Sequence, residues 1–416
     1  MQAFIIAAIG CVLWFIYLVV LERILPCDII AGAPLPMMMI QETTQTEDII
    51  NNNTNNTNKK AKVDAAEQKR LNYRINGHLS LWLTLALLSI GKPNMNLDDF
   101  FALSGGGVKM TFQPYYSLHL LCEYYVELAL ATVVLTCLLS IWLYIKSFQR
   151  PNDTLLAKGG CSGYAVYDFY MGRELNPRSF SNSFDWKEFC ELRPGLILWL
   201  IINLAMAIQQ HRLLGYVTGS MILINVFQGF YVWDALYNER AILTTMDITT
   251  DGFGFMLCFG DMAWVPITYS LQARYLVHYD PHLNLIQLSG ILLLNCFGYF
   301  IFRSANGEKD AFRTDPNGLA VQHLEYMQTQ RGTRLLTSGW WGMARKINYT
   351  GDWIMGLSWC LVCGVQSVVP YFYAVYFCVL LVHRAARDDH LCGQKYGEDW
   401  AEYKKKVPYL FVPGVV

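Results

Sequence analysis

Long apolar stretches recur from one end of this chain to the other and constrain its fold more than any other feature. Hydrophobic residues make up 54% of the sequence and charged residues only 16%, whereas soluble proteins carry about 25% charged residues. Several stretches approach the ~20 residues that a helix needs to cross a bilayer, so the sequence predicts an all-α polytopic membrane protein with about ten transmembrane helices. The candidate stretches are residues 3–21, 79–90, 121–145, 196–208, 213–233, 253–277, 283–302, 353–365 and 368–382.

Three hydrophilic connections interrupt the apolar pattern, at residues 41–70, 150–194 and 303–346. All three carry several Lys or Arg residues, and because basic loops tend to stay on the cytosolic side, we expect them in the cytosol together with the C-terminal tail. The first is rich in Asn and Thr and has no periodic apolar face, so we expect it to be disordered. Asn52 and Asn55 begin glycosylation sequons there, whose use depends on the side of the membrane.

Charge and histidine distribution exclude several classes of protein. The formal net charge of −1 and the lack of a basic tail argue against a nucleic-acid binder. The eight histidines are dispersed, whereas membrane di-iron oxidases need clustered histidine boxes, so we expect no metal. Cys360 and Cys363 form a CxxC inside an apolar stretch with no second pair nearby, which favours packing over redox or zinc chemistry.

A charged segment, HRAARDDHLCGQKYGEDW at residues 383–400, follows the last apolar stretch. If the helix of that stretch continues, Arg384 and Asp388 are spaced i,i+4 and share a face. Charges at the edge of the membrane are costly and usually functional, so this segment predicts a polar site at the mouth of the bundle. A salt-bridged helix end that reaches into water is the alternative.

Residues 302–313, FRSANGEKDAFR, follow another apolar stretch directly. Lys309 and Arg313 lie one helical turn apart, and two such cations near Arg384 would form a strong site for phosphates. A positively charged anchor on the cytosolic side is the alternative for this string.

Residues 335–353, LLTSGWWGMARKINYTGDW, place aromatic residues between two apolar regions. Trp340 and Trp341 are flanked by Gly339 and Gly342, and since glycine lets the backbone approach closely, the pair could form a flat wall for a planar ring. An aromatic belt at the membrane interface is the alternative.

Taken together, these strings resemble the sterol reductase family, membrane enzymes that reduce the C14 or C7 double bond of sterols. The resemblance begins at about Leu71 with LNYRING, and it includes YDFYMGRELNPR, FCELRPG and the C-terminal segment up to Val407, Pro408 and Tyr409. Arg173 and Glu174 favour the C14 type, the delta(14)-sterol reductases.

The resemblance implies NADPH as the cofactor. The chain has no GxGxxG after a strand, so nicotinamide binding would use a helical membrane pocket. Departures from the family pattern are Lys346, where histidine is usual, Leu410, where a basic residue is expected, and the pair Gly307 and Glu308. The resemblance marks as cofactor-binding Lys309, Arg313, Leu336, Trp341, Asn348, Tyr349, Arg384, Asp388, Lys395 and Tyr396.

The reaction itself constrains the active site. A sterol alkene has no carbonyl to polarise, so a protein acid must protonate one carbon before hydride can add to the other, and an acid is needed near the hydride donor. We expect Tyr231 to donate the proton and Asp388 to support it. Aromatic faces from Trp233, Trp264 and Tyr269 would shield the carbocation.

The resemblance also implies an organisation and a location. We expect a first helix and polar loop at residues 1–70, transmembrane helices with the sterol-facing part at 71–280, and an NADPH-binding half at 281–416 whose pocket opens to the cytosol. The expected location is the endoplasmic reticulum membrane, multi-pass, with continuity to the inner nuclear membrane left open. The expected partners are a sterol substrate and the bilayer, with no nucleic acid and no metal.

Other functions remain open at this stage. A C7 reductase shares the cofactor half and differs in the shape of the sterol pocket. A lamin B receptor-like anchoring protein is disfavoured because the first span begins at Ala3. A prenylcysteine methyltransferase would lack the RSAN and GRELNPR strings. An inactive reductase is the strongest rival, because Lys346 and Leu410 lie in or beside the cofactor half.

Overall fold

The computed structural model describes residues 1–33, 70–89, 118–149 and 154–415. The chain divides into two compact units, which we call the N-terminal unit (residues 1–103, 109–217 and 228–274) and the C-terminal unit (104–108, 218–227 and 275–416). Each is described by itself. The predicted disorder at 41–70 lies almost wholly outside the described residues.

Helices dominate both units, as expected for an all-α membrane protein. Within the described ranges, 5 helices are long and apolar enough to cross a membrane. The helix count of about ten stays a prediction, since the other apolar stretches form shorter or interrupted helices. The five candidate spans are Gln2–Ile24, Tyr125–Lys146, Trp186–Leu214, Leu285–Thr314 and Val369–Tyr396.

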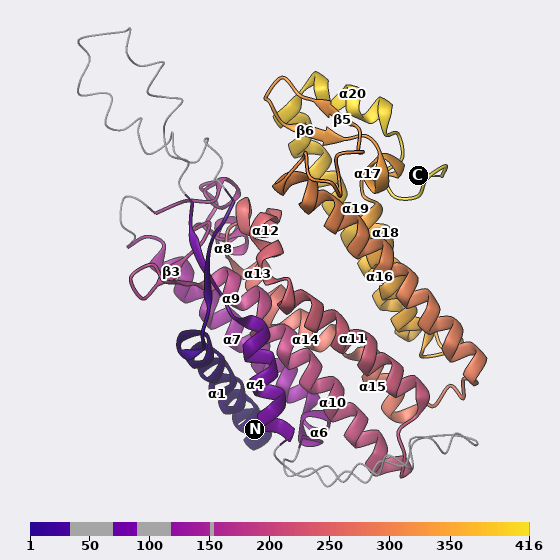
Figure 1. The fold of residues 1–416 in the computed structure, drawn as a ribbon. Coiled ribbons are helices and arrows are strands. Elements are labelled where there is room, and N and C mark those ends of the chain that lie inside the picture. The colour runs from indigo at the N-terminus through magenta and orange to yellow at the C-terminus, as the bar shows by residue number, and fades with distance from the viewer. Residues whose placement is uncertain (34–69, 90–117, 150–153, 416) are drawn as a thin grey trace. The chain divides into compact units, whose positions relative to one another are not determined.

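The N-terminal unit is a helical bundle with two short two-stranded antiparallel sheets at one end (Figure 1). Sheet β1–β2 pairs Asp28 with Ile75, so it joins the end of the first helix to the start of the next, and β3–β4 is a hairpin. The long elements are α1 (Gln2–Ile24), α4 (Gly77–Ser89), α7 (Tyr125–Lys146), α10 (Pro194–Leu214) and α11 (Gly219–Tyr237), of which residues 228–237 belong to this unit. The strands are β1 (Asp28–Ala31), β2 (Asn72–Ile75), β3 (Arg178–Ser179) and β4 (Phe184–Asp185). Shorter helices are α6 (Leu120–Glu123), η1 (Lys158–Gly160), α8 (Ala165–Met171), α9 (Trp186–Leu192), η2 (Glu239–Thr244) and α12 (Met246–Thr249).

The apolar stretch at 253–277 is an interrupted helix. It runs as α13 (Phe255–Phe259), a π-helical turn η3 (Gly260–Trp264), α14 (Val265–Thr268) and α15 (Leu271–His278). Pro266, in the first turn of α14, has no N–H to continue the hydrogen-bond ladder, and the π-turn adds a second break. Periodicity alone did not reveal these breaks.

A buried network of charges ties the N-terminal unit together. Arg193 is fully buried and contacts Glu188 at 2.8 Å and Glu239 at 2.6 Å. Glu22, at the end of α1, forms an ion pair with Arg74 at 3.0 Å. Because buried charges are tolerated only when paired, this Arg193 network (Glu22, Arg74, Asn76, Glu188, Arg193, Glu239) requires α1, β2, α9 and η2 to meet in one arrangement.

The C-terminal unit consists of three long helices with a cap at one end (Figure 1). The helices are α16 (Leu285–Thr314), α18 (Ile347–Leu361) and α19 (Phe372–Tyr396), preceded by the turn η4 (Val369–Tyr371). A Cβ on Gly351 would lie 2.6 Å from the carbonyl oxygen of Gly298, so glycine allows α16 and α18 to cross closely. The cap comprises β5 (Tyr326–Gln328), β6 (Arg334–Leu336), α17 (Gly339–Met343) and α20 (Glu398–Lys406).

Candidate functional site

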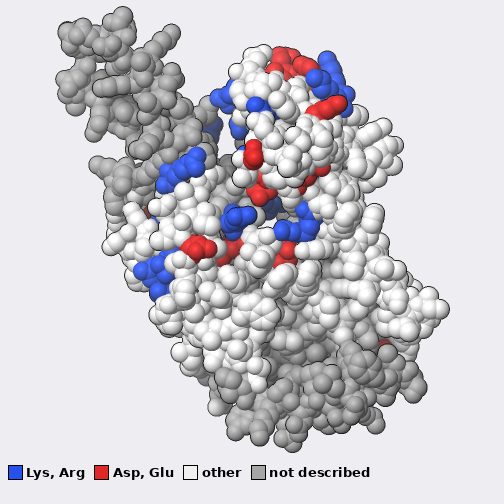
Figure 2. All heavy atoms as spheres, in the orientation of Figure 1, with Lys and Arg blue, Asp and Glu red and all other residues white. Residues whose placement is uncertain are grey.

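Two long helices carry predicted site residues out of the apolar region. Helix α16 continues to Thr314, so Lys309 and Arg313 lie one turn apart on it. Helix α19 continues to Tyr396 and places Arg384 and Asp388 one turn apart. Both helical extensions, expected from the spacing of the charges, are confirmed. Figure 2 shows charged side chains gathered over the cap of this unit, on the face in view.

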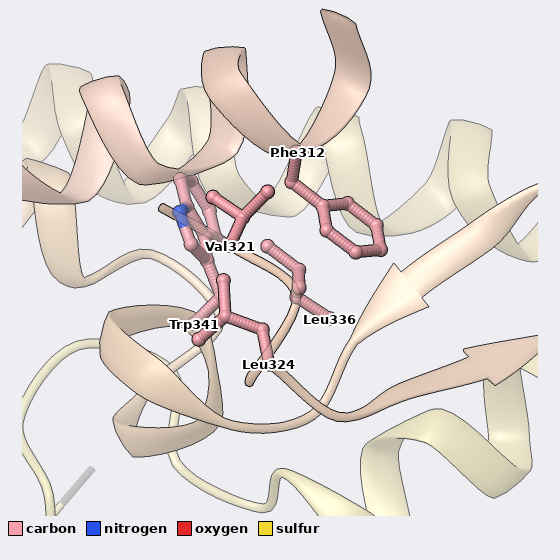
Figure 3. Close-up of a cluster of buried hydrophobic side chains, with 5 residues drawn as sticks. All are labelled: Phe312, Val321, Leu324, Leu336 and Trp341. Atoms are coloured by element: carbon pink, nitrogen blue, oxygen red, sulfur yellow. The ribbon is translucent and has the colours of Figure 1, made fainter. Parts of the chain in front are cut away.

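Lys309 packs over the ring of Trp341. Its ammonium is 3.7 Å from the centroid of the Trp341 ring, a cation–π contact. Trp341 Nε1 donates to the carbonyl oxygen of Ala305 at 2.7 Å, which fixes the indole on α16. Figure 3 shows the buried hydrophobic cluster behind the indole, to which Leu336 also belongs. Its members are Phe312, Val321, Leu324, Leu336 and Trp341.

Glu308 positions the start of α17, which carries this tryptophan. Its Oε1 accepts from the backbone N–H of Trp340 at 2.9 Å. Gly339 has a φ of +62°, and a Cβ there would lie 2.4 Å from Glu308 Oε2. The glycine is therefore required by both backbone conformation and space. The departure from the family pattern at Glu308 has a structural role next to Lys309.

Lys346 forms an ion pair with Asp388, in which its ammonium donates to Oδ2. The same ammonium lies 5.5 Å from the centroid of the Tyr349 ring. The thiol of Cys392 lies 3.8 Å from Asp388 Oδ2. The sequence did not reveal this pairing, because Lys346 and Asp388 are on different elements and no pattern connects them.

Leu410, the second departure from the family pattern, contacts the same lysine through its backbone. Its carbonyl oxygen accepts from the backbone N–H of Lys346 at 2.8 Å, next to a second bond from Arg345 N to Tyr409 O at 3.0 Å. The tail is thus held to the loop before α18 by backbone groups that any side chain at 410 provides.

Positive charge exceeds negative charge in this cation cluster, which we define as Lys309, Arg313, Lys346 and Asp388. Arg313, Lys346 and Asp388 are the charged neighbours of Lys309. Three cations around one carboxylate leave net positive charge, which suits the phosphates of a nucleotide. Arg384, half-buried, lies one turn before Asp388.

A polar atom beside this cluster lacks a partner. Asn348 Nδ2 contacts Asn306 Oδ1 at 3.2 Å, while Asn348 Oδ1 is buried and has no hydrogen-bond partner within the described ranges. A buried acceptor without a donor costs free energy, so this atom is suited to a ligand N–H or O–H. The cation cluster and Asn348 therefore fit NADPH, with cations for its phosphates and an acceptor for one of its hydrogen-bond donors.

Lys395 and Tyr396 contact the cap. Arg331 Nη1 donates to the carbonyl oxygen of Lys395 at 3.1 Å, and Tyr396 stacks on Trp400 with ring centroids 6.3 Å apart. The predicted role of these two residues in cofactor binding stays a prediction. Cys392 packs beside the same aromatic cluster and also contacts Asp388, so it links the two groups.

Tyr231 belongs to the N-terminal unit, on α11, and is half-buried. Its ring lies 6.2 Å from that of Trp199, which in turn makes an edge contact with Tyr269 at 5.3 Å. Two of the predicted aromatic residues therefore meet through a third, Trp199, that the sequence analysis did not single out. Trp233 instead stacks on Phe230 and Tyr237, at 5.4 and 5.2 Å, and Trp264 lies 6.1 Å from Phe259.

A buried amide holds this aromatic group. Gln228 Oε1 accepts from Trp199 Nε1 at 3.1 Å and from Asn203 Nδ2 at 2.6 Å, and Gln228 Nε2 donates to the carbonyl oxygen of Tyr269 at 3.0 Å. A glutamine inside an apolar span is costly and marks a functional region. That signal was available in the string NVFQGFYVW and was missed.

Comparison with known proteins shows the family of this chain. A family model described as the Ergosterol biosynthesis ERG4/ERG24 family matches residues 49–416. The chain belongs to this family.

Similar proteins carry the name delta(14)-sterol reductase. The chain is 54% identical over 292 residues to Delta(14)-sterol reductase erg24 of Schizosaccharomyces pombe, covering 70% of this chain and 68% of that one. It is 48% identical over 353 residues to Delta(14)-sterol reductase TM7SF2 of Mus musculus, covering 85% and 79%. It is 48% identical over 346 residues to Delta(14)-sterol reductase LBR of Gallus gallus, covering 83% of this chain and 51% of that relative. The chain thus spans about half the length of the chicken protein.

Proposed function

We propose that this chain is a delta(14)-sterol reductase that uses NADPH to reduce the C14=C15 double bond of sterol 8,14-dienes in sterol biosynthesis. The observation that carries the proposal is the cation cluster beside Trp341, in a chain of the ERG4/ERG24 family. The names of the relatives support the sterol bond, and the endoplasmic reticulum membrane is the proposed location.

The cofactor would bind in the C-terminal unit. Lys309, Arg313 and Arg384 would bind phosphates, Trp341 would position the Lys309 ammonium over its ring, and the unpartnered Oδ1 of Asn348 would accept a hydrogen bond. NADPH, when bound, supplies a hydride. Leu336, Tyr349, Lys395 and Tyr396 complete the proposed binding set. The proposed division has the sterol-facing part at 71–280 and the NADPH-binding half at 281–416, with the pocket open to the cytosol.

Protonation of the alkene would come from Tyr231. An isolated carbon–carbon double bond becomes an acceptor of hydride only after one of its carbons has gained a proton, which leaves a carbocation on the other. Tyr231 is half-buried beside Trp199, and this ring and that of Tyr269 offer negative π-faces to such a cation. Gln228 fixes the Trp199 ring through its Nε1 and Tyr269 through its backbone carbonyl.

Asp388 would act in support of the proton donor. A carboxylate paired with an ammonium has only acceptor sites, so the Lys346 ion pair favours a supporting role for Asp388 over that of the proton donor. The proton then comes from the tyrosine hydroxyl, which is left as a phenolate.

A reduction assay tests the proposal. Purified protein in detergent receives NADPH with a sterol 8,14-diene or, separately, a 5,7-diene, and the products are followed by mass. We expect saturation of the 14-bond alone, and loss of the product in Tyr231→Phe. Reduction of only the 5,7-diene would identify a C7 reductase, and reduction of neither diene would contradict the enzyme proposal.

A further inference from the structure

An apolar cavity of about 220 Å³ lies in the N-terminal unit and is lined by none of the site residues described above. It is bordered by α1, α7, α9 and the π-turn η3, and no polar surface lines it. A second hollow shares three of its residues and extends toward α10. The cavity is lined by Phe15, Leu135, Leu139, Trp142, Trp186 and Met262.

Tryptophans form one end of this cavity. Trp142 and Trp186 have ring centroids 5.0 Å apart, and Phe15 stacks on Trp186 at 6.2 Å. Trp186 Nε1 donates to Ser179 Oγ at 2.8 Å in hairpin β3–β4. Tryptophan with an apolar body and a hydrogen-bonded N–H is typical of the level where lipid chains meet headgroups, so this end is expected at the membrane interface.

A lysine stands at the same end. The ammonium of Lys146, the last residue of α7, lies 5.1 Å from the centroid of the Trp142 ring. It donates to the carbonyl oxygen of Arg178 at 2.6 Å and faces Ser179 Oγ at 3.4 Å. An ammonium has three N–H groups, so one can still be donated to an anion.

The neighbouring cations at this end are paired with acids. Arg178 Nη2 lies 3.1 Å from Asp185 Oδ2. Arg23 lies 4.0 Å from Glu22 and also donates to Ser183 Oγ at 2.9 Å. Within the described residues, Lys146 makes its hydrogen bonds to neutral oxygens and has Glu174 as a charged neighbour without an ion pair to it, so among these three cations it is the best suited to an external anion.

We propose that this cavity and Lys146 form a binding site for one anionic phospholipid of the bilayer, with an acyl chain in the cavity and the phosphate at the Lys146 ammonium. The lining excludes a polar occupant, and the lysine selects a negative headgroup over a neutral one. The site does not depend on the proposed reductase activity.

Quenching by brominated lipids tests this site. Purified protein is titrated with phosphatidylserine or phosphatidylcholine that carries dibrominated acyl chains, and tryptophan fluorescence is recorded for the wild type and for Trp142→Phe. We expect saturable quenching at lower mole fractions of phosphatidylserine, and a smaller quenched fraction in Trp142→Phe. Equal quenching by both lipids in the wild type would overturn the proposal.

Two lysine variants assign the headgroup contact. In Lys146→Gln the preference for phosphatidylserine should fall about fivefold, the effect of one lysine at an anionic surface. In Lys158→Gln, which removes an exposed lysine of the same unit, the preference should persist. Equal effects of the two variants, or no effect of Lys146→Gln, would contradict the assignment. Displacement of both brominated lipids by unlabelled sterol alone would show a sterol site instead.

Discussion

Two groups of charged side chains, one in each unit, differ in whether every charge has an oppositely charged partner within the group. In the N-terminal unit, the guanidinium of Arg193 has two carboxylate partners, and it also donates to Arg74 O at 3.1 Å and Asn76 Oδ1 at 3.2 Å. In the C-terminal unit, Lys346 pairs with Asp388, while Lys309 has Arg313 and Lys346 as well as Asp388 as charged neighbours. We call the first group closed, because every charged side chain in it has an oppositely charged partner within the group, and the second open, because its cations exceed its carboxylates. A closed group stabilises the fold, and an open one suits an anionic ligand.

Removal of Arg193 should have the largest effect on the protein. In Arg193→Met, Glu188 and Glu239 become unpaired buried carboxylates, and breaking such a network costs about 3–5 kcal/mol of folding free energy. We expect little folded protein by size-exclusion chromatography and a strongly lowered Tm in what remains.

The matched control is Arg212→Met, whose pair with Glu123 is exposed on both sides. An exposed pair contributes about 0–1 kcal/mol, so this variant should fold normally. If Arg193→Met were as stable as Arg212→Met, the buried network would not be what holds this unit together.

Removal of a cation from the open group should reduce cofactor binding and leave the fold intact. A hydrogen bond to a charged group contributes about 1.5–3 kcal/mol, so in Lys309→Gln the KM for NADPH should rise about 10–100-fold. Tm and the turnover at saturating NADPH should change little. Lys405→Gln, at an exposed position on α20, is the control. An unchanged KM in Lys309→Gln would show that the cluster does not bind the cofactor.

The sequence predicted the two charged helix ends well and the closed network poorly. Helical spacing placed Lys309 with Arg313 and Arg384 with Asp388, because residues four apart on one helix share a face whatever the tertiary fold. The Arg193 network joins residues from positions 22 to 239, and no local pattern encodes contacts of that range. The strings LNYRING and FCELRPG were noticed only as family motifs.

The same limit applies within the candidate site. The Lys346–Asp388 pair and the bridge from Gln228 to Trp199 depend on how helices pack, so their residues could be recognised as unusual but not as partners. The interruption of the helix over residues 253–277 could not be predicted for another reason. A π-turn and a proline interrupt the helix without changing the apolar composition of the stretch.

Replacement of Lys346 tests the ion pair between Lys346 and Asp388 in the open group. In Lys346→Gln, Asp388 loses its ion partner, and we expect kcat to fall about tenfold, the equivalent of ~1.4 kcal/mol. In Lys346→His, the imidazole is a cation only below its usual pKa of ~6.5, so kcat should recover as the pH is lowered from 8 to 6. A pH profile of kcat that is the same for both variants would contradict a role of the pair.

The smallest effect on stability is expected at Asp168, a carboxylate whose hydrogen-bond donors are neutral groups. Burial raises the pKa of Asp168, but hydrogen bonds from Ser162 and Gly163 outweigh it and hold the pKa below its ordinary value. A carboxyl group whose pKa is lowered by folding stabilises the folded state at pH values above its ordinary pKa. This stabilisation is lost as the pH falls through the lowered pKa. Asp168→Asn should therefore cost about 1 kcal/mol at pH 7 and less near pH 4. Parallel Tm curves from pH 7 to 4 would rule this out.

The most direct test of an open, phosphate-binding group is an equilibrium titration of the wild-type protein with NADPH and with NADH at low and high salt. NADPH carries one more phosphate, so the net positive charge of the cluster should make it bind at least about tenfold more tightly at low salt, with a gap that narrows as salt screens the charges. Equal affinity for the two nucleotides, independent of salt, would contradict the account.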